Sequence, residues 1–390
     1  MYCLNPFVTY VVWNIFILGL YFLDLTSLYE ADFLFGFVYF LPVLFLCVIN
    51  YNKFGKINFH SVLQIIENRA HRKNFFGFLY AIFWLGVLAS MYQIINYGTP
   101  LTLENKIGRP IGDHYVQYLV NFLTTSSMMS YVAIRFKFGN RIKSIFICVF
   151  SIALLAVWLN RGAYTPFLVT VVFIEYILAR RNKKANKFYL LMMILSISFV
   201  ILFGYVGNLR MEYVMEYVYH CTINQWYGMP EYIPTGFVQL YIYLTSPLEN
   251  AKHIFFEQCV WEYQYGVKMV YPFVAPIVKG IFFESTNIFP YLDKTLPVGL
   301  NVSTYFESAL IDFGYIGPYI YMIYISIFFR LCKFFCTKNI FGLLADISLI
   351  QMSLWMVFVH AFAIGPFMIN LLFFLIVAWI VDNNKKRKAL

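Results

Sequence analysis

Residues 188–206 read FYLLMMILSISFVILFGYV, nineteen residues without a charged side chain. About 20 mostly apolar residues in a helix are enough to cross the hydrocarbon core of a bilayer. Nine further segments have the same character: 3–22, 33–50, 75–95, 115–134, 144–160, 163–180, 315–335, 340–360 and 363–381. The sequence therefore predicts an all-α polytopic membrane protein with about ten transmembrane helices.

The overall composition supports the same class of protein. Of the 390 residues, 61% are hydrophobic and 12% are charged, whereas soluble globular proteins have about 25% charged residues. A chain this apolar would expose large apolar patches in water and would aggregate. A soluble enzyme, a disordered protein and a nucleic-acid-binding domain are therefore excluded, and the net charge of +10 needs another explanation.

The distribution of the basic residues supplies that explanation. Alternate connections and the C-terminal end hold 21 of the 29 lysines and arginines, in residues 51–74, 135–143, 180–187, 330–338 and 382–390. Cytoplasmic loops of membrane proteins are enriched in Lys and Arg. We therefore predict that both termini are cytoplasmic, and that the first apolar segment is retained because it lacks the features of a signal peptide. The basic charge indicates topology and predicts no nucleic-acid partner.

One outer connection is far longer than the others and sets the predicted organisation of the chain. It is rich in proline and in amphipathic stretches, which favours short helices that lie at the membrane interface or dip partly into the bundle over a soluble domain. Cys221 and Cys259 both fall in it and either pair in an oxidising compartment or remain free thiols. The predicted parts are helices one to seven in 1–206, the large outer loop in 207–314, helices eight to ten in 315–381 and a basic tail in 382–390.

Two arginines on the outer side are candidates for binding phosphate. Arg161 lies in the tight turn between the fifth and sixth apolar segments, and Arg210 lies where the seventh emerges. Cations are scarce on this side, and a guanidinium group binds phosphate through two parallel hydrogen bonds. The alternatives are that Arg161 contacts lipid phosphates and that Arg210 pairs with Glu212 or Glu216. We expect the two guanidinium groups to lie within about 20 Å of each other, close enough to share a diphosphate.

A second group of outer residues offers acid–base chemistry and sugar binding. Glu307 and Asp312 lie in 301–317, before the eighth apolar segment, and are candidate general bases together with His220. Helix capping and packing are the alternative roles for the two carboxylates. The candidates for sugar binding are the aromatic faces of Trp226, Tyr243 and Trp261 and the carboxylate of Glu249.

The spacing of possible metal ligands argues against a metal site. No Cys/His ligand pattern occurs in the chain, and a solvated loop is the better interpretation of the acidic residues Glu30 and Asp32. We predict no metal and no cofactor.

The pattern of spans, with one large outer loop late in the chain, resembles the bacterial oligosaccharide repeat unit polymerases, the Wzy-type O-antigen polymerases. Five local stretches carry the resemblance: YGTPL at 97–101, NRG at 160–162, GNLR at 207–210, YLTSPLEN at 243–250 and residues 301–317. The resemblance implies a GT-C-like fold in the bacterial inner membrane. It also implies transfer of a growing glycan from undecaprenyl diphosphate to a lipid-linked repeat unit, with inversion and without metal.

Within this resemblance, Arg161 and Arg210 would hold the leaving diphosphate, and the partners would be lipid-linked oligosaccharides, membrane lipids and a chain-length regulator. Two alternatives stay open. A flippase or other transporter of lipid-linked oligosaccharides would need buried charges, broken helices and repeat symmetry, and an O-antigen ligase would have a similar sequence pattern. The sugars, the linkage and the choice between O-antigen and capsule or exopolysaccharide stay undetermined.

Overall fold

The protein is seen in a computed structural model that describes residues 5–53, 62–65, 72–98, 114–158, 161–214, 220–257, 265–270, 304–336, 339–358 and 365–389. Among these residues the regular elements are all helical. In chain order they are α1 (Pro6–Tyr21), α2 (Phe33–Ile49), η1 (Tyr51–Lys53), α4 (Arg72–Tyr97), α5 (His114–Val120), α6 (Phe122–Arg135), α7 (Arg141–Val157), α8 (Arg161–Arg181), α9 (Ala185–Val214), α10 (Ile223–Trp226), α11 (Thr235–Glu257), α13 (Tyr305–Phe313), η4 (Gly314–Ile316), α14 (Gly317–Cys336), α15 (Ile340–Trp355) and α16 (Gly365–Ala389).

The described residues of each predicted apolar segment are largely helical, and the segment at 115–134 is divided into α5 and α6. In the described part of the chain, two helical runs are long and apolar enough to cross a membrane by themselves. These are Phe75–Tyr97 in α4 and Tyr305–Lys333, which runs from α13 through η4 into α14. The all-helical class is confirmed, and the ten-span topology and the GT-C-like fold stay predictions.

Polar residues define where several helices begin. The side chain of Asn5 accepts a hydrogen bond from Phe7 N at 3.1 Å, and Pro6 occupies the first turn of α1. Such a cap satisfies backbone N–H groups that have no partner inside the helix. The same device begins α2 at Asp32, α7 at Asn140, α13 at Thr304 and α15 at Asn339.

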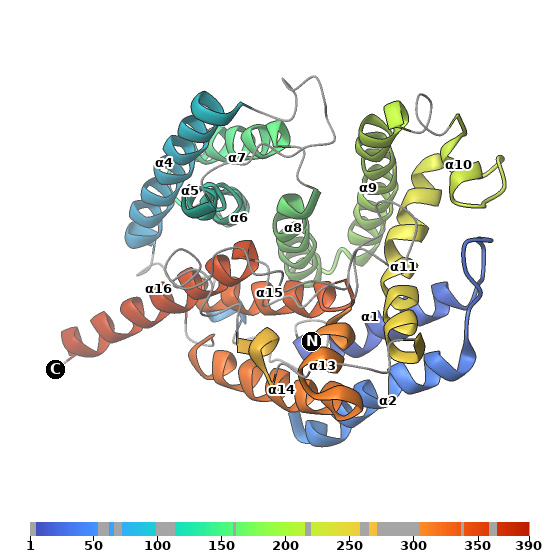
Figure 1. Ribbon diagram of the computed structural model, residues 1–390. Helices are drawn as coiled ribbons and strands as arrows, with labels where there is room; N and C mark the ends of the chain where they lie inside the picture. The colour runs from blue at the N-terminus through green and yellow to red at the C-terminus, as the bar shows by residue number, and fades with distance from the viewer. Residues whose placement is uncertain are drawn as a thin grey trace.

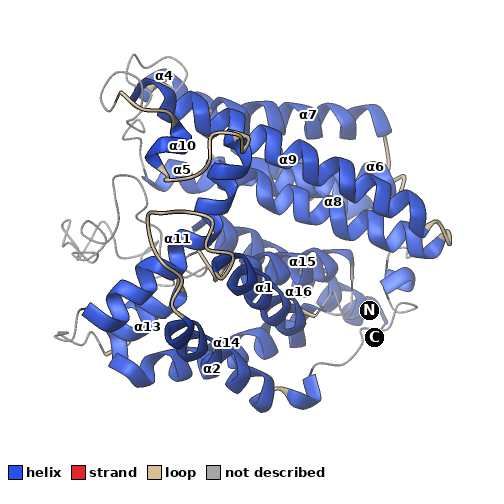
Figure 2. Cartoon of the chain, turned by 90° about the vertical axis from the view of Figure 1, so that its right-hand side faces the viewer, coloured by secondary structure: helices blue, strands red, loops and turns tan. Residues whose placement is uncertain are grey.

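The helices form two groups that are visible in both views (Figures 1 and 2). The middle of the chain, α4 to α9, makes one group, and the two ends of the chain, α1 and α2 with α13 to α16, make the other. Contacts of α1 with α15 and of α2 with α14 join the ends. Helix α11 runs beside both groups, because it packs against α9 and also against α1.

Small hydroxyl side chains line the contact of α6 with its neighbours. Five of them are fully buried: Thr124, Thr125, Ser126, Ser127 and Ser130. Ser126 Oγ and Ser151 Oγ of α7 are 2.7 Å apart, and Thr125 donates to Asn370 of α16. Small residues let membrane helices approach closely and hydrogen-bond across the interface, so α6 acts as the central helix of its group.

Helices α9 and α11 cross at a pair of glycines, where they lie side by side (Figure 1). A Cβ atom placed on Gly204 would lie 2.3 Å from the Cα atom of Gly236. The two backbones therefore touch directly, which no larger residue at Gly204 would allow.

The segment predicted as a large outer loop contains more helix than expected. Helix α9 extends to Val214, beyond the predicted end at 206, and α11 has 23 residues. Pro247 lies inside α11 without ending it, and the side chains of Val238 and Leu248 are fully buried. The described part of 207–314 is thus built into the helix bundle rather than lying only on its surface. Helix α16 likewise continues to Ala389, through most of the predicted tail.

Candidate active site

An apolar cavity of about 610 Å³ lies between the two groups of helices. Five helices supply its walls: Thr9, Trp13 and Phe16 of α1; Thr165, Leu168, Val169, Val172 and Phe173 of α8; Met192, Leu195, Ser196 and Val200 of α9; Leu240, Tyr243 and Leu244 of α11; and Ile350, Leu354, Trp355 and Phe358 in or directly after α15. This volume is typical of ligand-binding pockets, which lie at about 300–1,000 Å³.

One wall of the cavity is held by hydrogen bonds between helices. Thr165 Oγ1 accepts from Trp355 Nε1 at 3.1 Å and lies 3.3 Å from Gln351 Nε2. These contacts join α8 to α15, two helices that the sequence separates by more than 150 residues. The cavity therefore depends on both helix groups.

The two candidate phosphate-binding arginines lie in α8 and α9, two of the helices that form walls of this cavity. Arg161 is the first residue of α8, about 6 Å along the helix from Thr165. Arg210 lies in the last turns of α9, about 15 Å along that helix beyond Val200. Because the chain turns back between α8 and α9, both residues are at the end of these helices away from the turn at 182–184. Their side chains lie outside the described part, so their predicted proximity stays a prediction.

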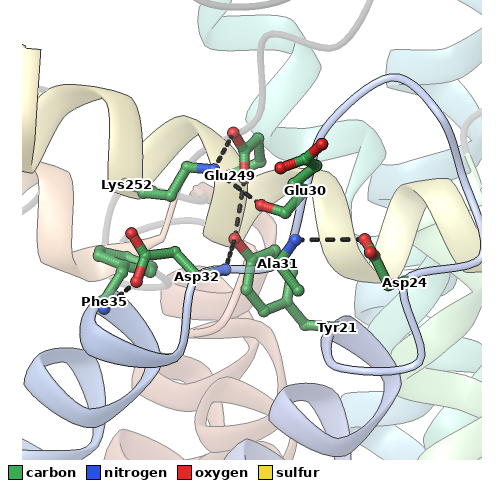
Figure 3. A network of polar contacts seen from close by, with 8 residues as sticks. All are labelled: Tyr21, Asp24, Glu30, Ala31, Asp32, Phe35, Glu249 and Lys252. Atoms are coloured by element: carbon green, nitrogen blue, oxygen red, sulfur yellow. Dashed lines mark hydrogen bonds and ion pairs between the residues drawn. The ribbon is translucent and has the colours of Figure 1, made fainter.

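A partly buried ion pair lies beside the C-terminal end of α1 (Figure 3). Glu249 of α11 is nearly buried, and its Oε1 lies 2.6 Å from Nζ of Lys252 one turn later. Its other oxygen accepts a hydrogen bond from the Tyr21 hydroxyl at 2.9 Å. Lys252 also donates to the backbone oxygen of Glu30 at 2.9 Å. The sequence suggested Glu249 as a sugar ligand, and the structure gives this carboxylate two protein partners.

The connection between α1 and α2 is fastened to this region by hydrogen bonds, while Asp24 and Glu30 within it are exposed to solvent. Asp24 accepts from Ala31 N at 3.2 Å, and Asp32 caps α2 by accepting from Phe35 N at 3.0 Å (Figure 3). Further bonds reach α11 and the residues after α10: Leu25 N to the Tyr241 hydroxyl, Thr26 to Tyr227 O, Ser27 N to Gly228 O and Tyr29 to Thr245. The side chains of Asp24 and Asp32 thus have structural roles as turn and cap acceptors.

A second buried polar cluster surrounds Asp312 near the end of α13. Its carboxylate accepts from Lys268 N at 3.0 Å, from Met269 N at 2.9 Å and from the Tyr321 hydroxyl at 2.7 Å. With three donors on its two oxygens, Asp312 is better suited to fixing the backbone at 268–269 than to accepting a proton. The carboxylate of Glu307, five residues earlier on α13, is also buried.

Lys268 brings a positive charge into this cluster. Its side chain retains 5% of its accessible surface, the same fraction as Glu307. Burial lowers the pKa of Lys268, whereas the charges of Glu307 and Asp312 raise it.

Helix α13 also lies next to the cavity and to the Glu249 network. Tyr305 N donates to Met356 O at 3.2 Å, and Trp355 and Phe358 on either side of Met356 line the cavity. On the other side, the rings of Phe255 in α11 and Phe306 in α13 are 5.9 Å apart. Helix α13 thus lies between the two features.

No family model matches this chain. No curated protein and no solved structure matches it either. The interpretation of the site consequently depends on its own residues.

The remaining predicted site residues are dispersed. Tyr243 lines the cavity, with its ring 5.3 Å from that of Phe358. His220 is exposed, and Trp226 ends the short helix α10. Trp261 lies outside the described residues. In the described segments, no group of three His, Cys, Asp or Glu side chains is placed to hold a metal ion.

Three residues of these clusters were not singled out from the sequence: Tyr21, Lys252 and Lys268. The two lysines carried a usable signal, because they belong to the same small set of outer cations that drew attention to Arg161 and Arg210. Tyr21 had no such signal, since a tyrosine at the end of an apolar helix is common at membrane interfaces.

Proposed function

We propose that this protein is a bacterial inner-membrane glycosyltransferase that polymerises oligosaccharide repeat units carried on undecaprenyl diphosphate. In this proposal the chain crosses the membrane about ten times, with both termini in the cytoplasm. The growing glycan is transferred from its lipid carrier to the free end of a new lipid-linked repeat unit at the outer face.

The observation that carries the proposal is the apolar cavity and its relation to Arg161 and Arg210. The cavity walls are almost wholly apolar, which suits a segment of an isoprenoid chain. The two walls formed by α8 and α9 bear the arginines at the same end. A ligand with a lipid chain joined to a diphosphate combines these two chemistries.

The surface of the bundle supports a membrane location. Helix α9 exposes a face of large apolar side chains, with Tyr189, Met193, Ile197 and Ile201 each more than half exposed, and α4 does the same with Trp84, Leu88 and Ile95. Such faces are unfavourable in water and favourable against lipid chains. The turn between α6 and α7 and the turn between α8 and α9 lie at the same end of the bundle in Figure 2, and both contain lysine. This agrees with a cytoplasmic location for that end.

The proposed step balances without a further reactant. A hydroxyl oxygen of the acceptor sugar bonds to the anomeric carbon of the donor from the face opposite the diphosphate, and the bond from that carbon to the diphosphate oxygen breaks. The hydroxyl proton passes to a general base, for which Glu307 is the candidate. The diphosphate leaves with the electron pair, and the guanidinium groups of Arg161 and Arg210 stabilise its charge.

Glycan analysis of a deletion strain tests the proposal. We expect loss of the ladder of long chains with a single repeat unit still attached at the surface, and recovery of the ladder when the intact gene is returned. Loss of every surface repeat unit would contradict polymerisation and would point to the flippase or the ligase. A strain whose ladder is unchanged would remove all three functions.

A further inference from the structure

Helices α6 and α8 end in the same kind of turn, and each turn places a lysine where glycine is usual. The backbone N–H of the residue after the lysine donates to the carbonyl oxygen five residues earlier, at 2.9 Å in both turns. This bond is the mark of a Schellman motif, in which the residue before the donor has a left-handed backbone. That residue is Lys137 with φ 57° after α6 and Lys183 with φ 54° after α8. Glycine adopts this conformation without strain and lysine does not, so the turns themselves do not require the lysines.

The two turns lie at the same end of the bundle (Figure 2). Arg135, the last residue of α6, donates two hydrogen bonds to the carboxylate of Glu175 in α8, and the Tyr131 hydroxyl donates to the same carboxylate at 2.6 Å. These bonds tie the end of α6 to α8 less than two helical turns before α8 ends. Glu175 is the one acidic residue in 131–190, and its charge is matched by Arg135.

The remaining charge at this end of the bundle is positive and exposed. Six exposed cations lie in the two turns and in the first turns of α7 and α9: Lys137, Arg141, Lys143, Lys183, Lys184 and Lys187. We call this surface the basic end. Beside it, large apolar side chains are each more than half exposed, Ile142 and Phe146 on α7 and Tyr189 and Leu190 on α9. Positive charge and exposed apolar surface therefore adjoin one another.

We propose that the basic end is a binding surface for anionic phospholipids, with the cations on the headgroup phosphates and the neighbouring apolar side chains against the acyl chains. A phospholipid complements both parts of the surface, whereas an acidic soluble protein complements only the charge. Orientation in the membrane requires only an excess of basic residues in these loops, and it does not require lysine at both left-handed positions. The inference goes beyond the proposed function and shares with it only the location in a membrane.

Lipid binding by the purified full-length protein in a nonionic detergent tests the proposal. The probe is phosphatidylglycerol with a fluorophore on one acyl chain, and its anisotropy reports the bound fraction. Phosphatidylcholine with the same chains and fluorophore is the zwitterionic comparison. We expect phosphatidylglycerol to bind about tenfold more tightly or better at low salt, since each cation near the headgroups contributes about fivefold. Salt screens exposed charges, so this preference should shrink steeply at about 0.5 M salt.

The left-handed lysines allow a variant in which charge and fold are separated. Lys137→Gly combined with Lys183→Gly removes two cations and relieves the strain of both turns. We expect its affinity for phosphatidylglycerol to fall about 25-fold, which is about fivefold for each charge. Its affinity for phosphatidylcholine should not change, and its unfolding temperature should be equal or higher. A purely structural role for the lysines predicts no loss of binding in this more stable variant.

Two matched variants complete the comparison. Lys137→Arg combined with Lys183→Arg keeps both charges and should keep the preference for phosphatidylglycerol. Lys279→Gln combined with Lys294→Gln removes two charges from the predicted outer loop and should leave both affinities unchanged.

Three outcomes overturn the inference. The first is equal affinity for the two lipids, and the second is an unchanged affinity for phosphatidylglycerol in the double glycine variant. The third is displacement of phosphatidylglycerol by millimolar glycerol phosphate or by polyglutamate, which would indicate a soluble phosphate or an acidic protein as the ligand. Because none of these measurements uses polymerisation, they decide the lipid surface whether or not the glycan analysis supports the proposed function.

Discussion

At the scale of single residues, a substitution at Arg161 can distinguish binding of a substrate diphosphate from simple contact with lipid headgroups. Lysine retains the positive charge of arginine and loses its planar fork. If Arg161 grips a diphosphate at two points, Arg161→Lys should lower the polymerisation rate about 30- to 1000-fold, the effect of about 2–4 kcal/mol in a desolvated site. The measurement is the glycan ladder together with the rate of the purified protein, at matched amounts in the membrane.

The same helix offers the control for this experiment. Arg181 is exposed at the other end of α8, so Arg181→Lys should leave the ladder and the rate unchanged. A full ladder in Arg161→Lys would remove Arg161 from the site and leave Arg210 as the remaining arginine candidate for the diphosphate.

Candidate site residues could be predicted from the sequence where their residue types are rare in the predicted outer segments. Scarce outer cations and paired carboxylates drew attention to Arg161, Glu307 and Asp312, all of which lie on or next to the helices that build the site. The residues that contact them in the structure carried no comparable signal in the sequence. Lys268 is 44 positions before Asp312 in the chain, and nothing in the residues between them indicates that its backbone N–H bonds to that carboxylate. That contact is a product of tertiary packing.

At the scale of helices, the close crossing of α9 and α11 predicts that a larger residue at Gly204 destabilises the protein. Ala is favoured over Gly in a helix interior by about 1 kcal/mol, so Gly→Ala normally stabilises. At Gly204 the new Cβ would meet backbone of α11, which must move away. We expect Gly204→Ala to be destabilised by about 1–3 kcal/mol and to unfold at a lower temperature in detergent.

Gly77 of α4 gives the same substitution without the contact. A Cβ atom there meets no atom within 4 Å, so Gly77→Ala should unfold at the same or a slightly higher temperature. Equal behaviour of the two variants would mean that α9 and α11 do not pack as described.

The helices themselves were largely predictable, because long apolar runs leave few alternatives to helix in a membrane. The exception is α11. Its proline and its polar residues suggested interruptions, but Pro247 is tolerated, Glu249 is buried with a hydrogen bond to Tyr21 of α1, and Asn250 is buried. The tendency of proline and polar residues to interrupt a helix is outweighed here by packing against other helices, which a single sequence does not reveal.

At the scale of the whole molecule, the feature that no local pattern predicts is the cavity. Its walls come from the first helix, three central helices and a helix near the C-terminus. Apolar runs predict each of these helices separately, whereas the empty volume depends on how the two helix groups meet. A ligand that fills this volume would in turn hold the groups together.

A bulky side chain in the cavity tests whether it receives the lipid chain. Ser196 of α9 lines the cavity, and Ser196→Trp would occupy part of its volume. Excluding two methylene groups of a bound chain costs about 1.6 kcal/mol, which corresponds to about tenfold in affinity. We expect KM for a lipid-linked donor with a long isoprenoid chain to rise about tenfold or more, while a donor with a short chain is affected much less.

Ile197→Trp is the matched control, because Ile197 is the next residue on α9, is 53% exposed and is not among the cavity-lining residues. Its KM for both donors should stay unchanged. If Ser196→Trp and Ile197→Trp behave alike toward the long-chain donor, the lipid chain binds elsewhere and the cavity has another occupant.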